Sequence, residues 1–202
     1  MSSPACPDEI YTHFAPIYDQ MVKHMPNWQE WISSVIPHLK GPRVLDISFG
    51  TGYLLTQIAG QVEAFGIELN AVMISHARQN LTCPVHLQRA DAHQLPYRAN
   101  TFDSIINTMA FNGYPDSLRT LSEMHRALRP GGRLLIVDVN PPTDGNLVGT
   151  VFARRWETRL DPDLDMGSLF KRVGFDYDDH EIGGFGSVHL YIAVKRRQSL
   201  AK

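Results

Sequence analysis

Residues 44–55 read VLDISFGTGYLL, and this stretch indicates the class of fold. An apolar strand ends at the acid Asp46, the chain turns through Gly50 and Gly52, and a helical pattern begins at Tyr53. In open α/β sheets, ligands bind at the carboxyl ends of such strands, and glycines let them approach the backbone closely. The start of the following helix offers unpaired N–H groups to a ligand. We therefore expect a ligand site at this strand-to-helix turn.

Apolar, β-branched runs alternate with helical patterns on both sides of this turn, which is typical of βαβ units and a parallel sheet covered on both faces. Three glycines in residues 183–186 separate two further strand patterns and indicate a terminal antiparallel hairpin. The sequence thus predicts an α/β, Rossmann-like three-layer sandwich with a mostly parallel, seven-stranded sheet. The strands are expected at residues 43–48, 62–68, 85–89, 102–108, 133–139, 175–182 and 188–194.

Composition excludes several function classes. The 202 residues are 43% hydrophobic and 20% charged, which suits one globular domain. Nineteen Lys and Arg against 21 Asp and Glu give a net charge of −2, which argues against a dedicated duplex-DNA binder. No apolar run approaches the ~20 residues of a membrane span, and no signal peptide is recognised. Two cysteines make no disulfide framework, so we expect a cytoplasmic protein. The oligomeric state stays open.

The glycine loop and a second acid indicate the kind of ligand. The pattern is S-x-G-x-G, without the third glycine of the dinucleotide fingerprint, and no phosphate-binding loop with its lysine occurs. Asp46 would repel a pyrophosphate and suits a cationic group such as an ammonium. Glu68 ends the second predicted strand, where a carboxylate can accept hydrogen bonds from both ribose hydroxyls.

Read together, these segments resemble the class I S-adenosylmethionine-dependent methyltransferases. The most similar group comprises the relatives of ubiquinone/menaquinone C-methyltransferases and phospholipid N-methyltransferases. Residues 89–97 (RADAHQLPY), 100–106 (NTFDSII) and 126–136 (RALRPGGRLLI) match further segments of this family in the correct order. The resemblance implies S-adenosylmethionine as the cofactor and S-adenosylhomocysteine as its product. It also implies one methyltransferase domain over residues 1–202.

The resemblance implies a division of that domain and roles for its residues. Residues 1–40 form a helical cap, residues 43–139 the cofactor-binding core, and residues 140–202 the acceptor-side helices and hairpin. In the core, the methionine part is held around Asp46, and Glu68 binds the ribose. The family usually has glycine in place of Ser48, whose side chain narrows this approach. The cofactor-binding residues implied are Asp46, Ser48, Gly50, Gly52, Glu68, Leu69, Asp91, Ala92 and Asn107.

Individual contacts follow from the same resemblance. Leu69 is expected to pack on the adenine, while Asp91 accepts a hydrogen bond from its amino group. The backbone N–H of Ala92 donates to the ring, and Asn107 faces the sulfonium and the acceptor.

The implied reaction is direct displacement at a methyl carbon that the sulfonium already activates. The protein then needs neither a nucleophile nor a metal, and no metal-binding pattern occurs among the nine histidines and two cysteines. An acceptor that must lose a proton needs a base. Candidates for this base are Tyr11, His13 and Tyr18 in the predicted N-terminal cover. The other histidines, among them His93, His125 and His189, are less convincing.

An apolar helical stripe between residues 147 and 160 carries Arg154, Arg155 and Arg159 beside it. Packing on the sheet is the simpler interpretation, and a substrate lid or a peripheral membrane contact is the alternative. We expect a small-molecule or lipid-like methyl acceptor and no nucleic acid partner. Whether methylation occurs on nitrogen, oxygen or carbon stays open.

Three functions are therefore compared. The first is a methyltransferase that acts on a small molecule or lipid headgroup. The second is a non-catalytic module that binds an adenosyl ligand, and the third is an NAD-dependent oxidoreductase on a related fold. Fold alone does not choose between them. The missing third glycine and the acid before the loop disfavour the third.

Overall fold

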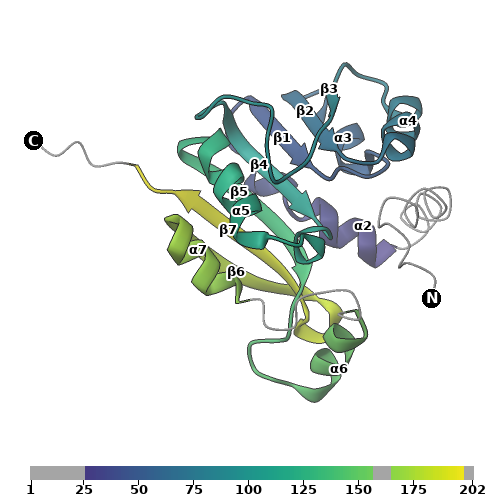
Figure 1. Cartoon of the computed structure of the whole chain (residues 1–202). Coiled ribbons are helices and arrows are strands. Elements are labelled where there is room, and N and C mark those ends of the chain that lie inside the picture. Colours follow the sequence, from purple (N-terminus) through teal and green to yellow (C-terminus); the bar gives the residue numbers. More distant parts are fainter. Residues whose placement is uncertain (1–25, 157–164, 198–202) are drawn as a thin grey trace, which may run out of the picture.

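A computed structural model describes residues 26–156 and 165–197. Its centre is a seven-stranded sheet with the order β3-β2-β1-β4-β5-β7-β6 (Figure 1). The strands are β1 (Arg43–Ile47), β2 (Glu63–Glu68), β3 (His86–Arg89), β4 (Phe102–Thr108), β5 (Leu128–Val139), β6 (Phe175–Gly183) and β7 (Val188–Lys195).

The first five strands are parallel, and β7 runs antiparallel between β5 and β6. The predicted fold, a mostly parallel sheet that ends in an antiparallel hairpin, is confirmed. Because β7 is reversed, its first residues lie beside the carboxyl end of β5, where Asp138 pairs with His189. The residues from Leu134 to Val137 are fully buried, since β5 has neighbours on both sides and helices on both faces.

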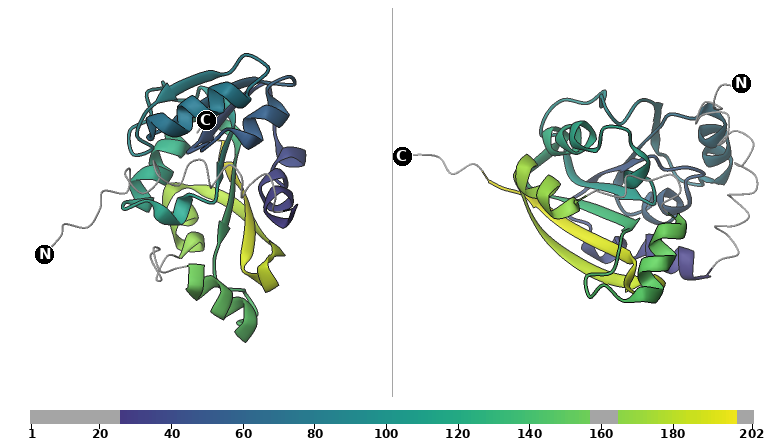
Figure 2. Two further views of the ribbon diagram at one scale, coloured as in Figure 1. Left: turned by 90° about the vertical axis from the view of Figure 1, so that its right-hand side faces the viewer. Right: turned by 60° about the horizontal axis from the view of Figure 1, so that its bottom comes forward.

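Helices cover both faces of the sheet (Figure 2). Side chains of α5 and α7 join one buried cluster, and side chains of α3, α4 and α6 join the cluster on the opposite face. Gly183 in β6 leaves room for Trp31 of α2, because a Cβ there would lie 2.1 Å from the indole nitrogen. The helices are α2 (Pro26–Ser33), α3 (Tyr53–Ile58), α4 (Ala71–Asn80), α5 (Ser117–Ala127), α6 (Leu147–Trp156) and α7 (Met166–Val173).

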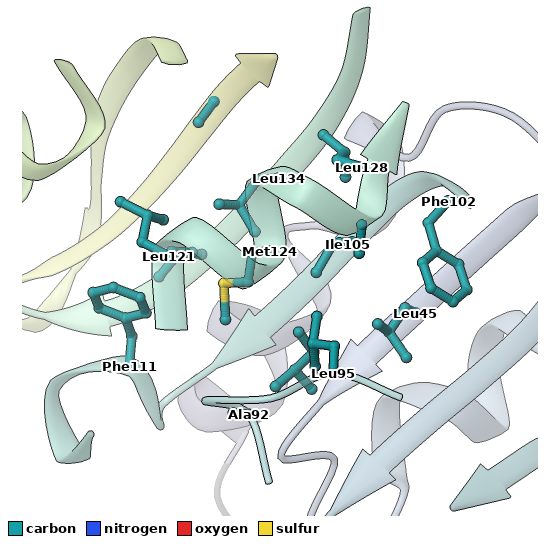
Figure 3. Packing of buried hydrophobic residues seen from close by; sticks show 14 of the residues in the cluster. Leu45, Ala92, Leu95, Phe102, Ile105, Phe111, Leu121, Met124, Leu128 and Leu134 are labelled. Atoms are coloured by element: carbon teal, nitrogen blue, oxygen red, sulfur yellow. The ribbon is translucent and has the colours of Figure 1, made fainter. Parts of the chain in front are cut away.

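The core beneath α5 supports the loop that follows β3 (Figure 3). Ala92 and Leu95 of this loop are buried in the same cluster as Leu121 and Met124 of α5. The backbone N–H of Leu95 also donates to the Glu123 carboxylate at 2.8 Å. These contacts fix the loop that carries Asp91 against the sheet.

Three elements differ from the sequence prediction or add to it. Within the predicted helical cap of residues 1–40, helix α2 ends at Ser33, and the chain continues as a short 3₁₀ turn, η1 (Ile36–His38), where Pro37 removes a backbone donor. Strand β5, expected over residues 133–139, already begins at Leu128. Helix α7 was not predicted, because it spans only eight residues. Its signals are local: the Asp165 side chain accepts from the backbone N–H of Ser168, and Gly174 ends the helix in a left-handed conformation.

Among the residues that the structure describes, no helix has the length and apolarity needed to cross a membrane.

Candidate active site

The glycine loop after β1 is held in a tight bend by its backbone. Ser48, Gly50 and Gly52 all have positive φ, at 57°, 57° and 80°. The backbone N–H of Ser48 donates to Ile67 of β2 at 2.8 Å, which ties the loop to the neighbouring strand. The Phe49 ring covers Gly66, where a Cβ would lie 2.6 Å from the ring. The predicted strand, glycine turn and helix are therefore present, with Gly52 as the N-cap of α3.

Glu68 at the end of β2 reaches across to this loop. One carboxylate oxygen accepts from the backbone N–H of Gly50 at 3.1 Å. The other accepts from the N–H groups of Leu69 and Asn70 at 2.8 and 3.0 Å. The carboxylate is thus held between the loop after β1 and the end of β2. A ligand that contacts both strand ends would find it in place.

Asp46 is buried directly beneath the bend, with 2% of its surface exposed. Its Oδ1 atom has no hydrogen-bond partner among the described residues. Burial, and to a lesser degree the Glu68 carboxylate, raise the pKa of Asp46 well above its ordinary value. In the part of the chain that the structure describes, this Oδ1 atom therefore has no donor to compensate for its burial. It lines a pocket together with Ile32, Ser48, Phe49, Thr51, Tyr53, Leu54 and Thr108.

Ser48 and Asn107 meet through a residue that the sequence analysis missed, Tyr114. The hydroxyl groups of Ser48 and Tyr114 lie 2.7 Å apart. The Asn107 amide donates to the Tyr114 hydroxyl at 3.0 Å and to the carbonyl of Ile47 at 2.9 Å. Because the Ile47 carbonyl fixes the amide orientation, the buried Oδ1 of Asn107 is an acceptor without a partner among the described residues.

Tyr114 lies in the loop after β4, just beyond the 3₁₀ turn η2 (Phe111–Gly113). Burial raises the pKa of its hydroxyl, which therefore stays protonated at neutral pH. An aromatic residue shortly after a strand end was a weak sequence signal for this contact.

The remaining predicted cofactor residues lie at the same edge of the sheet. The Leu69 side chain is 53% exposed, which leaves an apolar surface beside Glu68. Asp91 is exposed, and its carboxylate accepts from the backbone N–H of His93 and lies 2.7 Å from Nδ1 of the His93 ring. These hydrogen bonds lower the pKa of Asp91. Its carboxylate is thus an ionised acceptor at neutral pH.

Tyr11, His13 and Tyr18, the predicted base candidates, lie outside the described residues. Within the ranges 26–156 and 165–197, no group of three metal-ligating side chains is present.

A second group of polar side chains occupies the carboxyl end of β5, and sequence analysis did not identify it as a site. Asp138 is buried and accepts from the backbone N–H groups of Asn112 and Val139 at 3.0 and 2.8 Å. Burial raises the pKa of Asp138 to about 6, although these hydrogen bonds oppose the shift. On β7, Nδ1 of the buried His189 lies 2.7 Å from Oδ1 of Asp179 on the neighbouring strand β6. His189 was a weak candidate because only the hairpin register brings it to this edge.

An open sheet with this strand order and a glycine loop after β1 agrees with the predicted class I S-adenosylmethionine-dependent methyltransferase, and comparisons with known proteins show this class. A family model described as a methyltransferase domain matches residues 45–136. A solved S-adenosylmethionine-dependent methyltransferase from Thermotoga maritima superposes with a TM-score of 0.74 at 18% identity, over 93% of this chain and 99% of that one.

Curated relatives show which family of methyltransferases the chain belongs to. The demethylmenaquinone methyltransferase of Symbiobacterium thermophilum is 26% identical over 234 residues, which cover 94% of this chain and 92% of the relative. The ubiquinone/menaquinone biosynthesis C-methyltransferase UbiE of Idiomarina loihiensis is 33% identical over 196 residues, covering 80% and 78% of the two chains. The chain belongs to the UbiE-type family of methyltransferases. This decides for the enzyme, with S-adenosylmethionine as its cofactor, and against the non-catalytic module and the NAD-dependent oxidoreductase.

Proposed function

We propose that this enzyme methylates a ring carbon of a lipid-like hydroquinone, with the cofactor bound across the ends of β1, β2 and β4. The observation that carries the cofactor placement is the buried Asp46 oxygen without a partner among the described residues, beside the glycine loop and within electrostatic range of Glu68. The acceptor class is supported by the names of the curated relatives, which are demethylmenaquinone and ubiquinone/menaquinone methyltransferases.

The residues present fit S-adenosylmethionine, which supplies a methyl group on a positively charged sulfur. Asp46 would accept from the ammonium of the methionine part, because a buried carboxylate without a partner favours a cation. Glu68 would accept from the ribose hydroxyls, Leu69 would pack on the adenine, and Asp91 would accept from its amino group. Asn107 would face the reacting end of the cofactor through its Oδ1 atom, which has no partner among the described residues.

The other cofactor contacts are backbone contacts. Gly50 and Gly52 adopt the positive φ values that the tight loop requires, and Gly52 also leaves room for Ala77 of α4. The Ala92 N–H would donate to the adenine ring. Ser48 adds a hydroxyl where the family has glycine, and this hydroxyl is already bonded to Tyr114. We propose that residues 43–139 hold the cofactor, that residues 140–202 complete the acceptor side, and that residues 1–40 cap the site.

Catalysis by such a site consists mainly of alignment and exclusion of water. Holding the acceptor carbon in line with the methyl–sulfur bond can lower the barrier by up to ~7–11 kcal/mol. A positioned base that takes the hydroxyl proton of the acceptor contributes about 10²- to 10⁴-fold more. Tyr11, His13 and Tyr18 remain proposed candidates for that base.

The assay that tests this function uses purified enzyme, S-adenosylmethionine and a short-chain 2-prenyl-1,4-naphthohydroquinone kept reduced by dithionite. We expect formation of S-adenosylhomocysteine together with a product heavier by one methyl group attached to carbon. The oxidised quinone is the control and should not react, because its ring carbon is electron-poor. Cofactor binding without turnover of any hydroquinone, but with turnover of an amine or a lipid headgroup, would assign another acceptor class.

Helix α6 supplies a surface that suits a membrane-borne acceptor. Leu147, Val148 and Val151 are 77%, 59% and 50% exposed, and Phe185 of the neighbouring turn η4 (Gly184–Gly186) is 68% exposed. Exposed arginines follow at the end of the same helix. Apolar side chains flanked by cations are typical of contact with an anionic lipid surface. We propose that this face docks there while the enzyme works at the cytoplasmic side.

Substitution Leu147→Asp should weaken binding to vesicles of 30% phosphatidylglycerol by about tenfold or more, since burying a leucine side chain contributes about 1.5–3 kcal/mol. Co-sedimentation measures this partition. The matched control is Gln61→Asp, an exposed position near the end of α3, which adds the same charge far from α6. Equal binding of both variants would contradict the proposed membrane face.

A further inference from the structure

Three buried polar atoms without partners among the described residues lie around the carboxyl end of β5. They are Oδ1 of Asn112, Nδ2 of Asn140 and Nε2 of His189, and their residues are 6%, 8% and 1% exposed. Buried polar atoms are normally hydrogen-bonded, because leaving them unpaired costs stability. Several such atoms in one place therefore point to a polar ligand that completes them.

Hydrogen bonds and register place these atoms in one region. Asn112 donates through its backbone N–H to Asp138 and through its side chain to the carbonyl of Val139. Asn140 follows Val139 directly, and its own N–H donates to Ser187 at the start of the hairpin strand. His189 pairs with Asp138 in the sheet. The three atoms therefore come from a loop, the end of β5 and the beginning of β7.

The same face of the sheet connects this region to Asn107. Side chains alternate along a strand, and Ile136 and Tyr191 belong to the cluster under α5 and α7. Asp138 and His189 lie two residues further along their strands and face the same layer. Asn107 pairs with Ile136, so strand spacings place Asn107 and His189 roughly 12 Å apart.

The Asp179 carboxylate fixes the state of the imidazole. With Nδ1 2.7 Å from Asp179, the ring proton lies on Nδ1 and donates to the carboxylate. Nε2 then carries a lone pair and accepts a proton or a hydrogen bond. The ring also stacks on Tyr191, with the planes 9° apart, which holds its orientation.

We propose that Asn112, Asn140 and the Asp179–His189 pair form the acceptor subsite, in which Nε2 of His189 takes a hydroxyl proton from a dihydroxy-aromatic acceptor. This inference rests on the proposed function and assigns residues to its acceptor side. A hydroxyl is both donor and acceptor, so two hydroxyls match the mixed set of one amide donor, one amide acceptor and one imidazole acceptor.

The acceptor O–H bond would break as its proton moves to Nε2, and Asp179 would stabilise the imidazolium. The electron pair of the phenolate would be delocalised to the ring carbon, which would form the new C–C bond with the methyl group that S-adenosylmethionine supplies, the methyl–sulfur bonding pair staying on sulfur. The ring carbon would then lose its hydrogen as a proton, and the imidazolium would return its proton to the oxygen. The aromatic diol and the neutral imidazole are thus restored, and one proton is released overall.

The test compares kinetics and cofactor binding of His189→Asn with the wild type. Asparagine can still donate to Asp179 but has no base in place of Nε2. We expect kcat with the prenylated naphthohydroquinone to fall about a hundredfold. The calorimetric dissociation constant of S-adenosylmethionine should stay within twofold. The matched control is His125→Asn on α5, a histidine packed edge-on against Phe175, which should change neither. A His189→Asn kcat within twofold of the wild type would overturn the inference.

Asp179 is a positioning residue, and Asp179→Asn tests that role. We expect kcat to fall about tenfold while the acceptor KM stays within twofold of the wild type, because the neutral amide no longer fixes the imidazole tautomer or stabilises the imidazolium. Asn140→Ala should show the opposite pattern, with the acceptor KM raised about tenfold and kcat little changed. A kcat of Asp179→Asn within twofold of the wild type, or an unmoved KM of Asn140→Ala, would contradict these roles.

A binding measurement separates this inference from the proposed function. With S-adenosylhomocysteine present, 1,4-naphthohydroquinone should shift the imidazole ¹⁵N resonances of His189 in the full-length enzyme, and the Asn140→Ala variant should show a weaker titration. If the wild type turns over no hydroquinone yet this shift occurs, the subsite stands and the proposed reaction fails. Absence of the shift overturns the subsite even where turnover is observed.

Discussion

Asp46→Asn should weaken S-adenosylmethionine binding by about a hundredfold while stabilising the ligand-free protein. The carboxylate is buried and one oxygen lacks a partner among the described residues, so its charge is favourable only when a cation is bound. Losing a charge-assisted hydrogen bond costs about 1.5–3 kcal/mol, and a buried ion pair contributes more. Calorimetry measures the affinity, and thermal unfolding of the ligand-free protein measures the stability.

The pH dependence gives this prediction a second readout. Folding raises the pKa of Asp46, so its contribution to stability is greatest below its unfolded pKa of about 4 and is lost as pH rises through the raised value. The free energy of unfolding of Asp46→Asn should not fall with rising pH in this way. Its excess over the wild-type value should therefore become smaller at acidic pH. Binding of an ammonium should also release protons from wild-type Asp46, which makes the measured enthalpy depend on the buffer.

The control for this charge removal is Asp103→Asn at the opposite edge of the sheet. Asp103 accepts from Arg129 at 2.6 Å and from the backbone of Arg43 at 3.0 Å. Its substitution should lower stability and leave cofactor affinity unchanged. Equal cofactor affinities of wild type and Asp46→Asn would contradict the assignment of Asp46 to the ammonium.

Glu68→Ala should weaken cofactor binding by about 10- to 100-fold. The carboxylate is placed by three backbone N–H groups at the end of β2, so its oxygens need no reorganisation to meet a diol. Removing hydrogen bonds to a charged group costs about 1.5–3 kcal/mol. Adenosine, which lacks the methionine part, should lose affinity for the variant by the same factor, because only the ribose contact is affected.

A control exists on the same strand. Glu63 begins β2 and pairs at the surface with Arg43 at 3.1 Å, so Glu63→Ala should leave cofactor affinity within twofold. Glu68→Gln keeps one acceptor oxygen for the loop and tests whether the loss comes from loop distortion. If Glu68→Ala bound the cofactor within threefold of wild type, the ribose assignment would be wrong.

Much of the cofactor side was predictable because its signals are local. Asp46, Gly50 and Gly52 belong to one continuous stretch, and Glu68 ends the next apolar run along the chain. Alternating strands and helices also predicted the sheet, including the hairpin. The assignments to cofactor atoms stay predictions, because they concern contacts with a ligand.

The acceptor side was less accessible to sequence analysis, because its residues meet only in three dimensions. Tyr114 approaches Ser48 across 66 positions, and His189 reaches Asp138 only through the antiparallel register of β7. The position of a single tyrosine or histidine in a sequence does not show which strand or loop it will lie beside. Helix α7 escaped prediction for another reason, since two turns give too little periodicity to recognise.

The reversed direction of β7 has a consequence for how such an enzyme diversifies. The lining of the pocket that we propose for the cofactor is encoded between Ile32 and Thr108, whereas the hairpin that brings His189 to the proposed acceptor side is encoded after residue 174. The pocket lining and the hairpin lie at the same end of the sheet, but separate segments of the gene encode them. Mutations after residue 174 can therefore change the side chains proposed to contact the methyl acceptor. They leave the residues that line the proposed cofactor pocket unchanged.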